Sequence, residues 1–493
     1  MTLLLVSCFG DKSKTVFSPK VEDYVALSKT ILSVSVIADS LDVPWDVQYN
    51  HYDSSLYFTE IKGAISRLDL ATGKRKQLFV IPEVYHHRTL GLLGMALHPD
   101  FKAYPYVYVS YTTKYQDSIY SRLERFTYKK DTLTNPKVLL EIEGSTGHNG
   151  ARLAFSKNGK LLWATGDVDS PTHAQDSTTL NGKILRIEWD GSVPIDNPIQ
   201  GSYVYAWGFR NMQGLTVSDR GYVYTSEHGD AIEDEVNIIE PLRNYGWPVI
   251  EGKHDLPAEI AYAKQKNTKE PMRSWTPVIA PAGLAYYNSD QIPEWKNALL
   301  LTTLKSQSLR VLKLDESGKK IISEEIFFEN HYGRLRTLTV SPSGDIYLAT
   351  SNRDWNPQAG FPKTGDDKIL RINRVAKALK TPLKGRLVTG TKEAVKTGTA
   401  LYNAYCVSCH KGDGAGLGQV FPALKNSTKV NGDKAGLINL FLNGSVKPGK
   451  TEQMPAFNFL SDEDAASILS YIRKSWGNHS LAITPADIKK YRK

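Results

Sequence analysis

The sequence predicts a mainly β protein, in which a six-bladed β-propeller is followed by a small all-α domain. Two observations carry this prediction. A pair of short apolar strands recurs six times up to about residue 376, and a helical pattern then surrounds a single Cys-x-x-Cys-His motif. The chain has 493 residues, which is too long for one compact core. No apolar run approaches the roughly 18 residues that a membrane-spanning helix needs, so we expect no transmembrane helix.

The segment 1–32 precedes the repeats. Leu5-Val6-Ser7-Cys8 resembles the bacterial lipobox, at which a peptidase cuts before a lipid-bearing cysteine. The apolar stretch before Cys8 is short and no Lys or Arg precedes it, so a frayed terminus with one stray cysteine stays open as the alternative. We expect a lipoprotein signal remnant at 1–8, a tether at 9–32, and export to the periplasm or to a membrane surface of a bacterium.

The segment 33–376 contains the repeats. Each copy is an apolar strand, a turn and a second apolar strand that ends in Thr or Ser. The copies are anchored at Val47, Leu97, Phe155, Val217, Tyr286 and Val340. Successive anchors are roughly 50–70 residues apart, which suits one propeller blade per copy. A β-sandwich would instead show turn signals every 8–12 residues without the long period.

Polar, glycine-rich motifs lie between the predicted strands. They read Gly91-Leu92-Leu93-Gly94, Gly147-His148-Asn149-Gly150, Gly208-Phe209-Arg210-Asn211, Ser226-Glu227-His228-Gly229-Asp230 and Asn244-Tyr245-Gly246-Trp247-Pro248. In this order they resemble the soluble glucose and aldose sugar dehydrogenases that use pyrroloquinoline quinone (PQQ). The resemblance covers roughly residues 40–376. It implies a PQQ-dependent oxidation of a small sugar at its C1 hydroxyl.

The resemblance assigns the catalytic roles to two residues. His148 would be the general base, because an imidazole with a near-neutral pKa can take the hydroxyl proton while hydride leaves for the quinone. Arg210 would stabilise the negative charge that develops on the quinone oxygen. Asn211 would position the cofactor beside it.

The cofactor and a metal need further groups. PQQ is a tricarboxylate, and Lys305, Arg334 and Arg336 can supply the matching positive charge. The two arginines are two residues apart, so in a strand they face the same side. The resemblance also implies Ca²⁺, held by the backbone carbonyls of Gly229 and Asp230, which polarises the quinone.

Three positions depart from the pattern of the glucose oxidisers. Gly147 stands where an acidic residue precedes the base, Thr89 stands in place of a Gln, and Asp230 replaces a Pro. The first two bear on the sugar, so glucose specificity does not follow. A sugar-aldehyde (sorbosone-type) dehydrogenase stays an alternative, and so does a non-catalytic binding propeller with a redox cytochrome.

The C-terminal domain is predicted at 393–480, between a linker at 377–392 and a tail at 481–493. Cys406-Val407-Ser408-Cys409-His410 is the attachment signal of a c-type haem: Cys406 and Cys409 bind the porphyrin and His410 binds the iron. Met454, in a Met-Pro pair, is the expected second axial ligand. A zinc site would lack a fourth ligand. The order of these parts resembles a class I cytochrome c.

Charge separates the two halves. Residues 377–493 contain 18 Lys and Arg against 8 Asp and Glu, whereas the rest of the chain holds 43 against 44. We therefore expect no nucleic-acid partner; the basic end would face an acidic downstream redox protein, a respiratory-chain acceptor or anionic lipid, or serve solubility alone. The tether would bring the haem close to PQQ without a tight interface.

Overall fold

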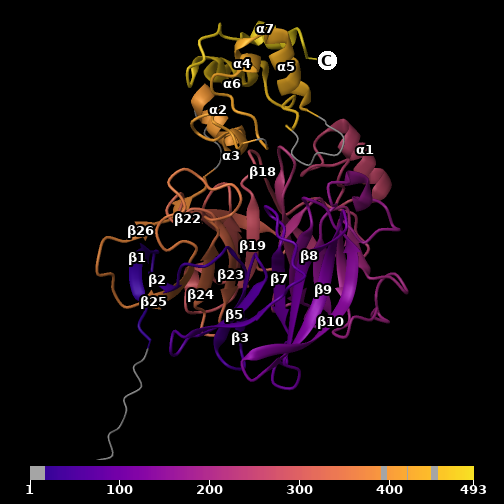
Figure 1. The fold of residues 1–493 in the computed structure, drawn as a ribbon, viewed down its shortest axis with the longest axis vertical. Coiled ribbons are helices and arrows are strands. Elements are labelled where there is room, and N and C mark those ends of the chain that lie inside the picture. The colour runs from indigo at the N-terminus through magenta and orange to yellow at the C-terminus, as the bar shows by residue number, and fades with distance from the viewer. Residues whose placement is uncertain (1–16, 390–396, 419, 446–453, 493) are drawn as a thin grey trace, which may run out of the picture.

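The computed structural model describes residues 17–389, 397–418, 420–445 and 454–492. Within these residues it contains six sheets, antiparallel except for the short parallel pairing of β1 with β26, followed by a helical region (Figure 1). The predicted fold class, a six-bladed propeller with a small helical domain, is confirmed. The proposed signal remnant at 1–8, with Cys8, lies outside the described residues. No described helix is long and apolar enough to cross a bilayer.

The first three blades follow the chain in order. Blade 1 contains β3 (Pro44–Asn50), β4 (Ser55–Glu60), β5 (Ala64–Asp69) and β6 (Arg75–Val80). Blade 2 contains β7 (Leu92–Leu97), β8 (Tyr106–Tyr115), β9 (Ser118–Lys129) and β10 (Thr132–Glu143). Blade 3 contains β11 (Gly150–Phe155), β12 (Leu161–Thr165), β13 (Lys183–Ile187) and β14 (Val204–Trp207), with a 3₁₀ turn at Pro171–Ala174.

The other blades add segments from elsewhere in the chain. Blade 4 contains β15 (Met212–Val217), β16 (Val223–Glu227), β17 (Asp234–Ile239) and β18 (Arg273–Trp275), with helix α1 (Pro257–Lys266) inserted before β18. Blade 5 contains β19 (Pro281–Tyr287), β20 (Ala298–Thr303), β21 (Leu309–Leu314), β22 (Ile321–Phe327) and β27 (Arg386–Leu387), with a 3₁₀ turn at Pro293–Trp295. Blade 6 contains β23 (Leu335–Val340), β24 (Ile346–Thr350), β25 (Ile369–Val375), β2 (Ile31–Ala38), β1 (Lys20–Ala26) and β26 (Leu383–Lys384).

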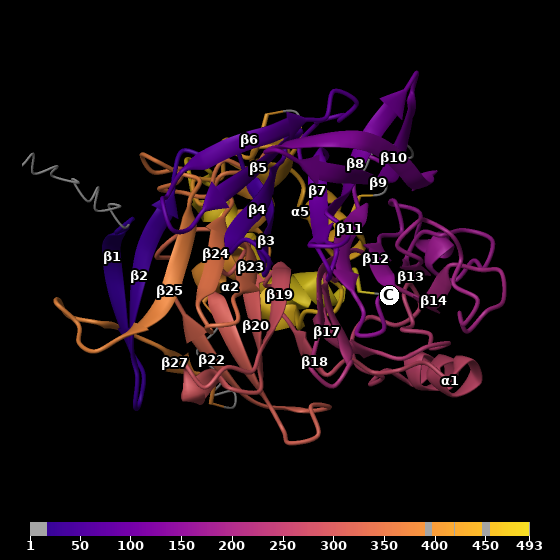
Figure 2. The same cartoon turned by 90° about the horizontal axis from the view of Figure 1, so that it is seen from below.

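The first strand of each blade faces the centre of the ring. Contacts run from β3 through β7, β11, β15, β19 and β23 back to β3 (Figure 2). Near its start, each of these strands skips one or two residues in its pairing with the second strand. Such β-bulges re-aim side chains and are common beside active sites. The skipped residues include Trp45, Gln213 and Arg336.

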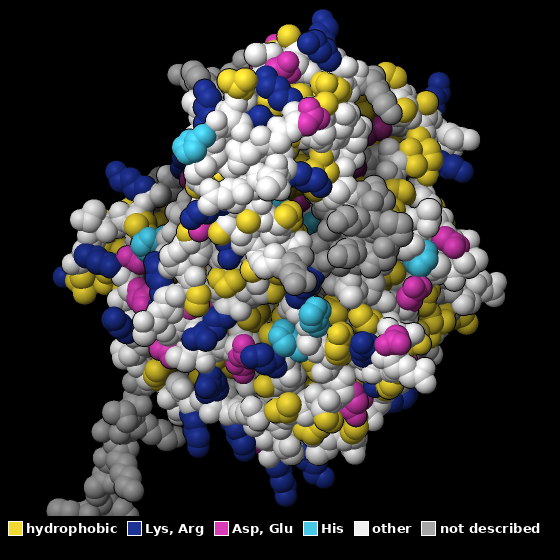
Figure 3. Space-filling model, turned by 45° about the horizontal axis from the view of Figure 1, so that its top comes forward, with side chains coloured by type: hydrophobic (Ala, Val, Ile, Leu, Met, Phe, Trp, Pro, Cys, Tyr) yellow, Lys and Arg dark blue, Asp and Glu magenta, His cyan; other side chains and the backbone are white. Residues whose placement is uncertain are grey.

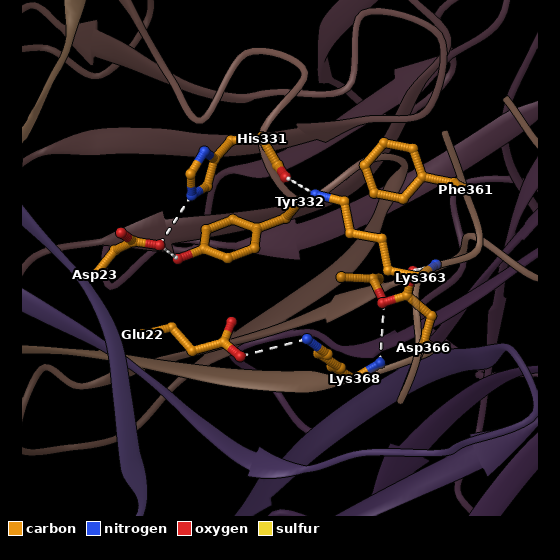
Figure 4. Close-up of a pocket in the computed structure, with 9 residues that line it drawn as sticks. Glu22, Asp23, His331, Tyr332, Phe361, Lys363, Asp366 and Lys368 are labelled. Carbon is orange, nitrogen blue, oxygen red and sulfur yellow. Dashed lines mark hydrogen bonds and ion pairs between the residues drawn. The ribbon is translucent and has the colours of Figure 1, made fainter. Parts of the chain in front are cut away.

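The expected tether at 9–32 is wrong from Lys20 onward. Strand β1 pairs with β2, and β2 pairs with β25, so the start of the chain supplies outer strands to blade 6. A cavity of about 220 Å³ lies between β1 and the loops of this blade (Figure 4). There Asp23 lies 2.8 Å from Nε2 of His331 and accepts a hydrogen bond from Tyr332 at 2.7 Å. These bonds hold β1 in place, and Glu22 faces Lys368 at 3.4 Å.

Two further boundaries differ from the prediction. Most of the expected linker at 377–392 is part of the propeller, because β26 pairs with β1 and β27 pairs with β22. Of the expected tail at 481–493, the described residues 481–492 pack onto the helical domain, since Ile483 and Ile488 are buried in its core. In both segments the apolar residues are few and are separated by Lys, Arg and Pro, so the sequence does not reveal that they pack against a domain.

The helical domain is built from α2 (Gly398–Tyr405), α3 (Val407–His410), α4 (Thr428–Asn431), α5 (Lys434–Asn443), α6 (Asp462–Lys474) and α7 (Pro485–Lys489). Ser461 caps α6 by accepting a hydrogen bond from the Asp464 amide at 3.1 Å. One apolar core joins these helices. The domain lies over one end of the propeller, with α3 toward it (Figure 1). On the face shown in Figure 3, Lys and Arg side chains are scattered over both domains rather than gathered in one patch.

Candidate active site

His148 lies in the loop before β11, where its φ of 47° places it in the left-handed region. Its Nδ1 atom lies 2.8 Å from Oδ1 of Asp167, whose side chain is fully buried. Trp247 donates its indole N–H to the other carboxylate oxygen of Asp167 at 2.8 Å. Because Asp167 accepts from Nδ1–H, the Nε2 atom of His148 is left as the basic nitrogen. This is the tautomer that a general base requires.

Arg210 belongs to the same wall. Its backbone carbonyl accepts a hydrogen bond from the Asp167 amide at 2.8 Å, and its guanidinium lies 5.4 Å from the ring centroid of Trp247. The guanidinium also donates to Oδ1 of Asp230 at 2.8 Å. Asp167 and Trp247 therefore join the two predicted catalytic residues, a link that the sequence reasoning missed. Trp247 stands in one of the recognised motifs, whereas Asp167 has no local signal beyond its place at the end of a strand.

His228 lies in the interior of this site, near Arg210 and Arg336. Burial lowers its pKa to about 3, and the positive charges of Arg210 and Arg336 act in the same direction. The ring is therefore neutral at physiological pH. Among the described residues, neither Nε2 of His228 nor Nε of Arg210 has a hydrogen-bond partner, although both atoms are buried. Buried polar atoms are normally satisfied, so these two are suited to bind a ligand.

The predicted cations lie around Asp354 and Asp234. Arg334 and Arg336 both donate to Oδ2 of Asp354, at 3.0 and 2.5 Å, so the two arginines do face the same side. Burial lowers the pKa of Arg336 to about 10. Lys305 is partly buried, which lowers its pKa, while the nearby charge of Asp234 opposes that shift. Neither aspartate was among the predicted site residues.

Asn211 is hydrogen-bonded to the loop that carries His148. Its Oδ1 atom accepts hydrogen bonds from the Gly150 amide at 3.3 Å and from Nε2 of Gln213 at 3.0 Å. It thereby joins the His148 loop of blade 3 to the inner strand of blade 4. Toward the ring centre, Arg152 forms a buried ion pair with Asp46 at 2.9 Å.

Gly229 and Asp230 form a tight turn after β16. The Gly229 amide donates to Oδ1 of Asp234 at 2.9 Å, and a Cβ at Gly229 would lie 1.8 Å from the Ile232 carbonyl oxygen. Only glycine fits this backbone. Across the described ranges, no three His, Cys, Asp or Glu side chains are arranged to hold a metal ion. A metal at this turn would take backbone carbonyl donors.

Gly147 has a structural reason to lack a side chain. A Cβ there would lie 2.9 Å from Oδ2 of Asp169, and the same carboxylate lies 3.4 Å from Nδ1 of His148 through its other oxygen. Ser145 donates its hydroxyl to Asp169 at 2.5 Å. Asp169 therefore brings an acidic group to the base from position 169 instead of 147.

The Cys-x-x-Cys-His motif spans α3. Cys406 and Cys409 are both free. Nδ1 of His410 lies 2.9 Å from the Pro422 carbonyl oxygen, which fixes that nitrogen as the donor and leaves Nε2 for a metal. Burial lowers the pKa of His410, which favours the neutral ring that binds iron. Met454 packs against the same apolar core as Cys406.

Comparisons with known proteins agree with this architecture. The family model described as Glucose / Sorbosone dehydrogenase matches residues 41–356, and that of Cytochrome C oxidase, cbb3-type, subunit III matches residues 393–472. The structure of the PQQ-bound form of an aldose sugar dehydrogenase from Streptomyces coelicolor is 31% identical, with a TM-score of 0.61, over 73% of this chain and 100% of that one.

Two curated relatives match the two halves separately. Aldose sugar dehydrogenase YliI of Escherichia coli (strain K12) is 28% identical over 335 residues, which cover 65% of this chain and 90% of that protein. The cytochrome c subunit of the quinone alcohol dehydrogenase of Gluconobacter oxydans is 33% identical over 103 residues, 19% of this chain and 22% of that subunit. With a propeller whose matched region covers more than half of the chain, this protein belongs to the glucose/sorbosone dehydrogenase family and carries a C-terminal cytochrome c domain.

Proposed function

We propose that this protein oxidises the C1 hydroxyl of an aldose to the lactone with PQQ and Ca²⁺, and that the electrons pass to a c-type haem in the same chain. The observation that carries the proposal is the His148–Asp167 contact of 2.8 Å in a wall shared with Arg210. The chain belongs to a family of sugar dehydrogenases, and a related aldose sugar dehydrogenase has a PQQ-bound structure, which supports the choice of cofactor.

The residues present fit PQQ. Lys305, Arg334 and Arg336 are buried or nearly so, and the orphaned nitrogens of Arg210 and His228 face no protein acceptor among the described residues. A rigid tricarboxylate supplies acceptor atoms for these nitrogens and carboxylates that can bind the cations. When bound, PQQ supplies an ortho-quinone that accepts hydride.

The protein's own part in the reaction is proton transfer and charge stabilisation. Nε2 of His148 takes the proton from the C1 hydroxyl, and the imidazolium formed is stabilised by the Asp167 carboxylate at Nδ1. Arg210 holds positive charge where negative charge develops. Asp230 keeps the Arg210 guanidinium in place through their 2.8 Å contact.

Calcium is proposed at the Gly229–Asp230 turn through the two backbone carbonyls. The rigidity of this turn, which Asp234 holds through the Gly229 amide, supports the proposal. Ca²⁺ prefers oxygen donors of this kind. In the helical domain, Cys406 and Cys409 would bind haem covalently, with His410 and Met454 as axial ligands. His/Met ligation raises the haem potential, which suits an electron acceptor.

The site departs from the glucose oxidisers in the origin of the acidic group beside the base. Asp169 occupies the acidic position beside the base, so a sugar with a different hydroxyl pattern, or a sugar aldehyde of the sorbosone type, is the alternative substrate. We also propose export, with lipidation at Cys8. A downstream redox protein or respiratory-chain acceptor would reoxidise the haem.

The test is a visible spectrum of haem-loaded protein with Ca²⁺ and PQQ, recorded after addition of single aldoses and of a sugar aldehyde. Haem reduction that requires both PQQ and an aldose supports the proposal, and the ranking of rates identifies the substrate class. Reduction by the aldehyde alone favours the sorbosone-type alternative. If no sugar reduces either the haem or an added dye, the proposed activity is wrong.

A further inference from the structure

The loop between β24 and β25 connects the propeller site to the helical domain. Asp354 in this loop holds Arg334 and Arg336, the arginines assigned to the cofactor. Its Oδ1 atom also accepts a hydrogen bond at 2.9 Å from the amide of the next residue, Trp355. The carboxylate that orders the arginines therefore orders the start of the Trp355–Asn356 pair as well.

The side chains of this pair contact the helical domain at the haem-attachment motif. Nδ2 of Asn356 donates a hydrogen bond to the carbonyl oxygen of Ser408, which lies between Cys406 and Cys409. The rings of Trp355 and Phe421 lie 5.5 Å apart at an angle of 45°. Phe421 directly precedes Pro422, whose carbonyl oxygen holds Nδ1 of His410.

A second blade also approaches the motif. Lys305, in the turn between β20 and β21, lies near the Cys406 and Cys409 side chains across the domain boundary. Asn356 is only 5% exposed although it lies on a surface loop, because the helical domain covers it. The contact is thus a defined interface, in contrast to the loose tethering expected from the sequence.

We propose that Trp355 and Asn356 form the docking contact through which electrons leave the propeller site for the haem domain, with Trp355 as the side chain between the two redox sites. The inference rests on the proposed function. It goes beyond it by naming where the two domains must meet for transfer. An aromatic ring at the boundary, joined to the arginine cluster through one peptide bond and the Asp354 ion pairs, is the chemistry that such a contact requires.

The electron count follows from the proposed reaction. Oxidation of one aldose releases two electrons and two protons; one proton goes to His148, and the hydride carries the other proton with both electrons. The haem takes one electron at a time, so an external one-electron oxidant must reoxidise it between the two transfers. The haem-reduction rate in the test below follows the first of these two transfers and needs no added oxidant.

The experiment uses the full chain loaded with haem, PQQ and Ca²⁺, with Trp355→Leu and Asn356→Ala as test variants. Trp189→Leu is the matched control, since Trp189 is an exposed tryptophan on blades 2 and 3 that stacks on Tyr106. Three quantities are measured: the rate of haem reduction after mixing with aldose, the steady-state rate with a small phenazine dye that takes electrons from the propeller site directly, and amide hydrogen exchange of residues 407–410 in the oxidised protein without sugar.

We expect each test variant to slow haem reduction by about tenfold, because a lost contact lowers the docked population. Exchange at 407–410 should become faster, and the dye-linked rate should stay unchanged. The control should match wild type in all three. Unchanged haem reduction, or unchanged exchange, in both test variants would overturn the inference. Absence of the dye-linked reaction in wild type would instead count against the proposed function.

Discussion

Nδ1 of His148 lies 2.8 Å from Oδ1 of Asp167, and this contact determines which nitrogen of the ring is available to substrate. The aspartate is itself held by the indole of Trp247 and by its own amide, which donates to the Arg210 carbonyl. His148, Asp167 and Arg210 thus form one hydrogen-bonded unit at the start of blades 3 and 4.

Asp167→Asn should lower kcat by about 100- to 1000-fold while KM changes little, because the amide no longer fixes the tautomer or stabilises the imidazolium. The measurement is dye-linked turnover across pH. Asp169→Asn is the comparison, since its longer 3.4 Å contact predicts a much smaller loss. Equal losses in the two variants would mean that Asp167 has no special role.

Gly147→Asp should weaken both stability and turnover. Its Cβ would lie 2.9 Å from the Asp169 carboxylate, and the added negative charge would face the one already there. We expect a loss of about 1–2 kcal/mol in the free energy of unfolding. The double variant Gly147→Asp/Asp169→Asn should recover most of it. A double variant no better than the single one would show that steric crowding by the new side chain, not charge, causes the loss.

Asp354→Asn should destabilise the protein by about 3 kcal/mol without PQQ, because it leaves two guanidinium groups without their carboxylate. Added PQQ should raise the melting temperature of this variant more than that of wild type, since the cofactor's carboxylates then compensate the arginines. Thermal unfolding with and without PQQ measures both effects. Asp345→Asn, which releases Arg371 on the outer part of blade 6, should show no such PQQ dependence.

Asp367 should make stability depend on pH. Burial raises its pKa to about 6, against the hydrogen bonds that it accepts from the Asn352 and Arg353 amides. The unfolded chain therefore releases this proton first, and the free energy of unfolding should fall by about 2 kcal/mol as the pH rises from about 4 to about 6.

Asp367→Asn should flatten that slope in urea titrations at several pH values. Asp69→Asn should change the pH slope of stability in the opposite direction. Hydrogen bonds from Thr72 lower the pKa of Asp69, so the stability that this carboxylate contributes is lost as the pH falls. A slope in the Asp367→Asn variant equal to that of wild type would assign the pH dependence to other groups.

The period of the repeat was enough to predict six blades, because each inner strand is apolar and recurs with similar spacing. The repeat did not predict β1, since Glu22 and Asp23 interrupt the apolar pattern of this strand. The position of β1 also depends on His331, which lies about 300 residues further along the chain. Asp354 was missed for the same reason: its role exists only when β23 and β24 lie side by side. The motif residues were found because each motif is local.

The pairing of β2 with β25 joins residues 31–38 to residues 369–375. During synthesis, the strand that completes blade 6 is among the first made, yet its partner is among the last of the propeller. Until β25 is made, β2 cannot join blade 6, and it presents an open edge of the kind that pairs with other chains. The ring therefore closes as a late event with a large loop to span, and a chaperone that shields β2 would protect the nascent chain at its most vulnerable point.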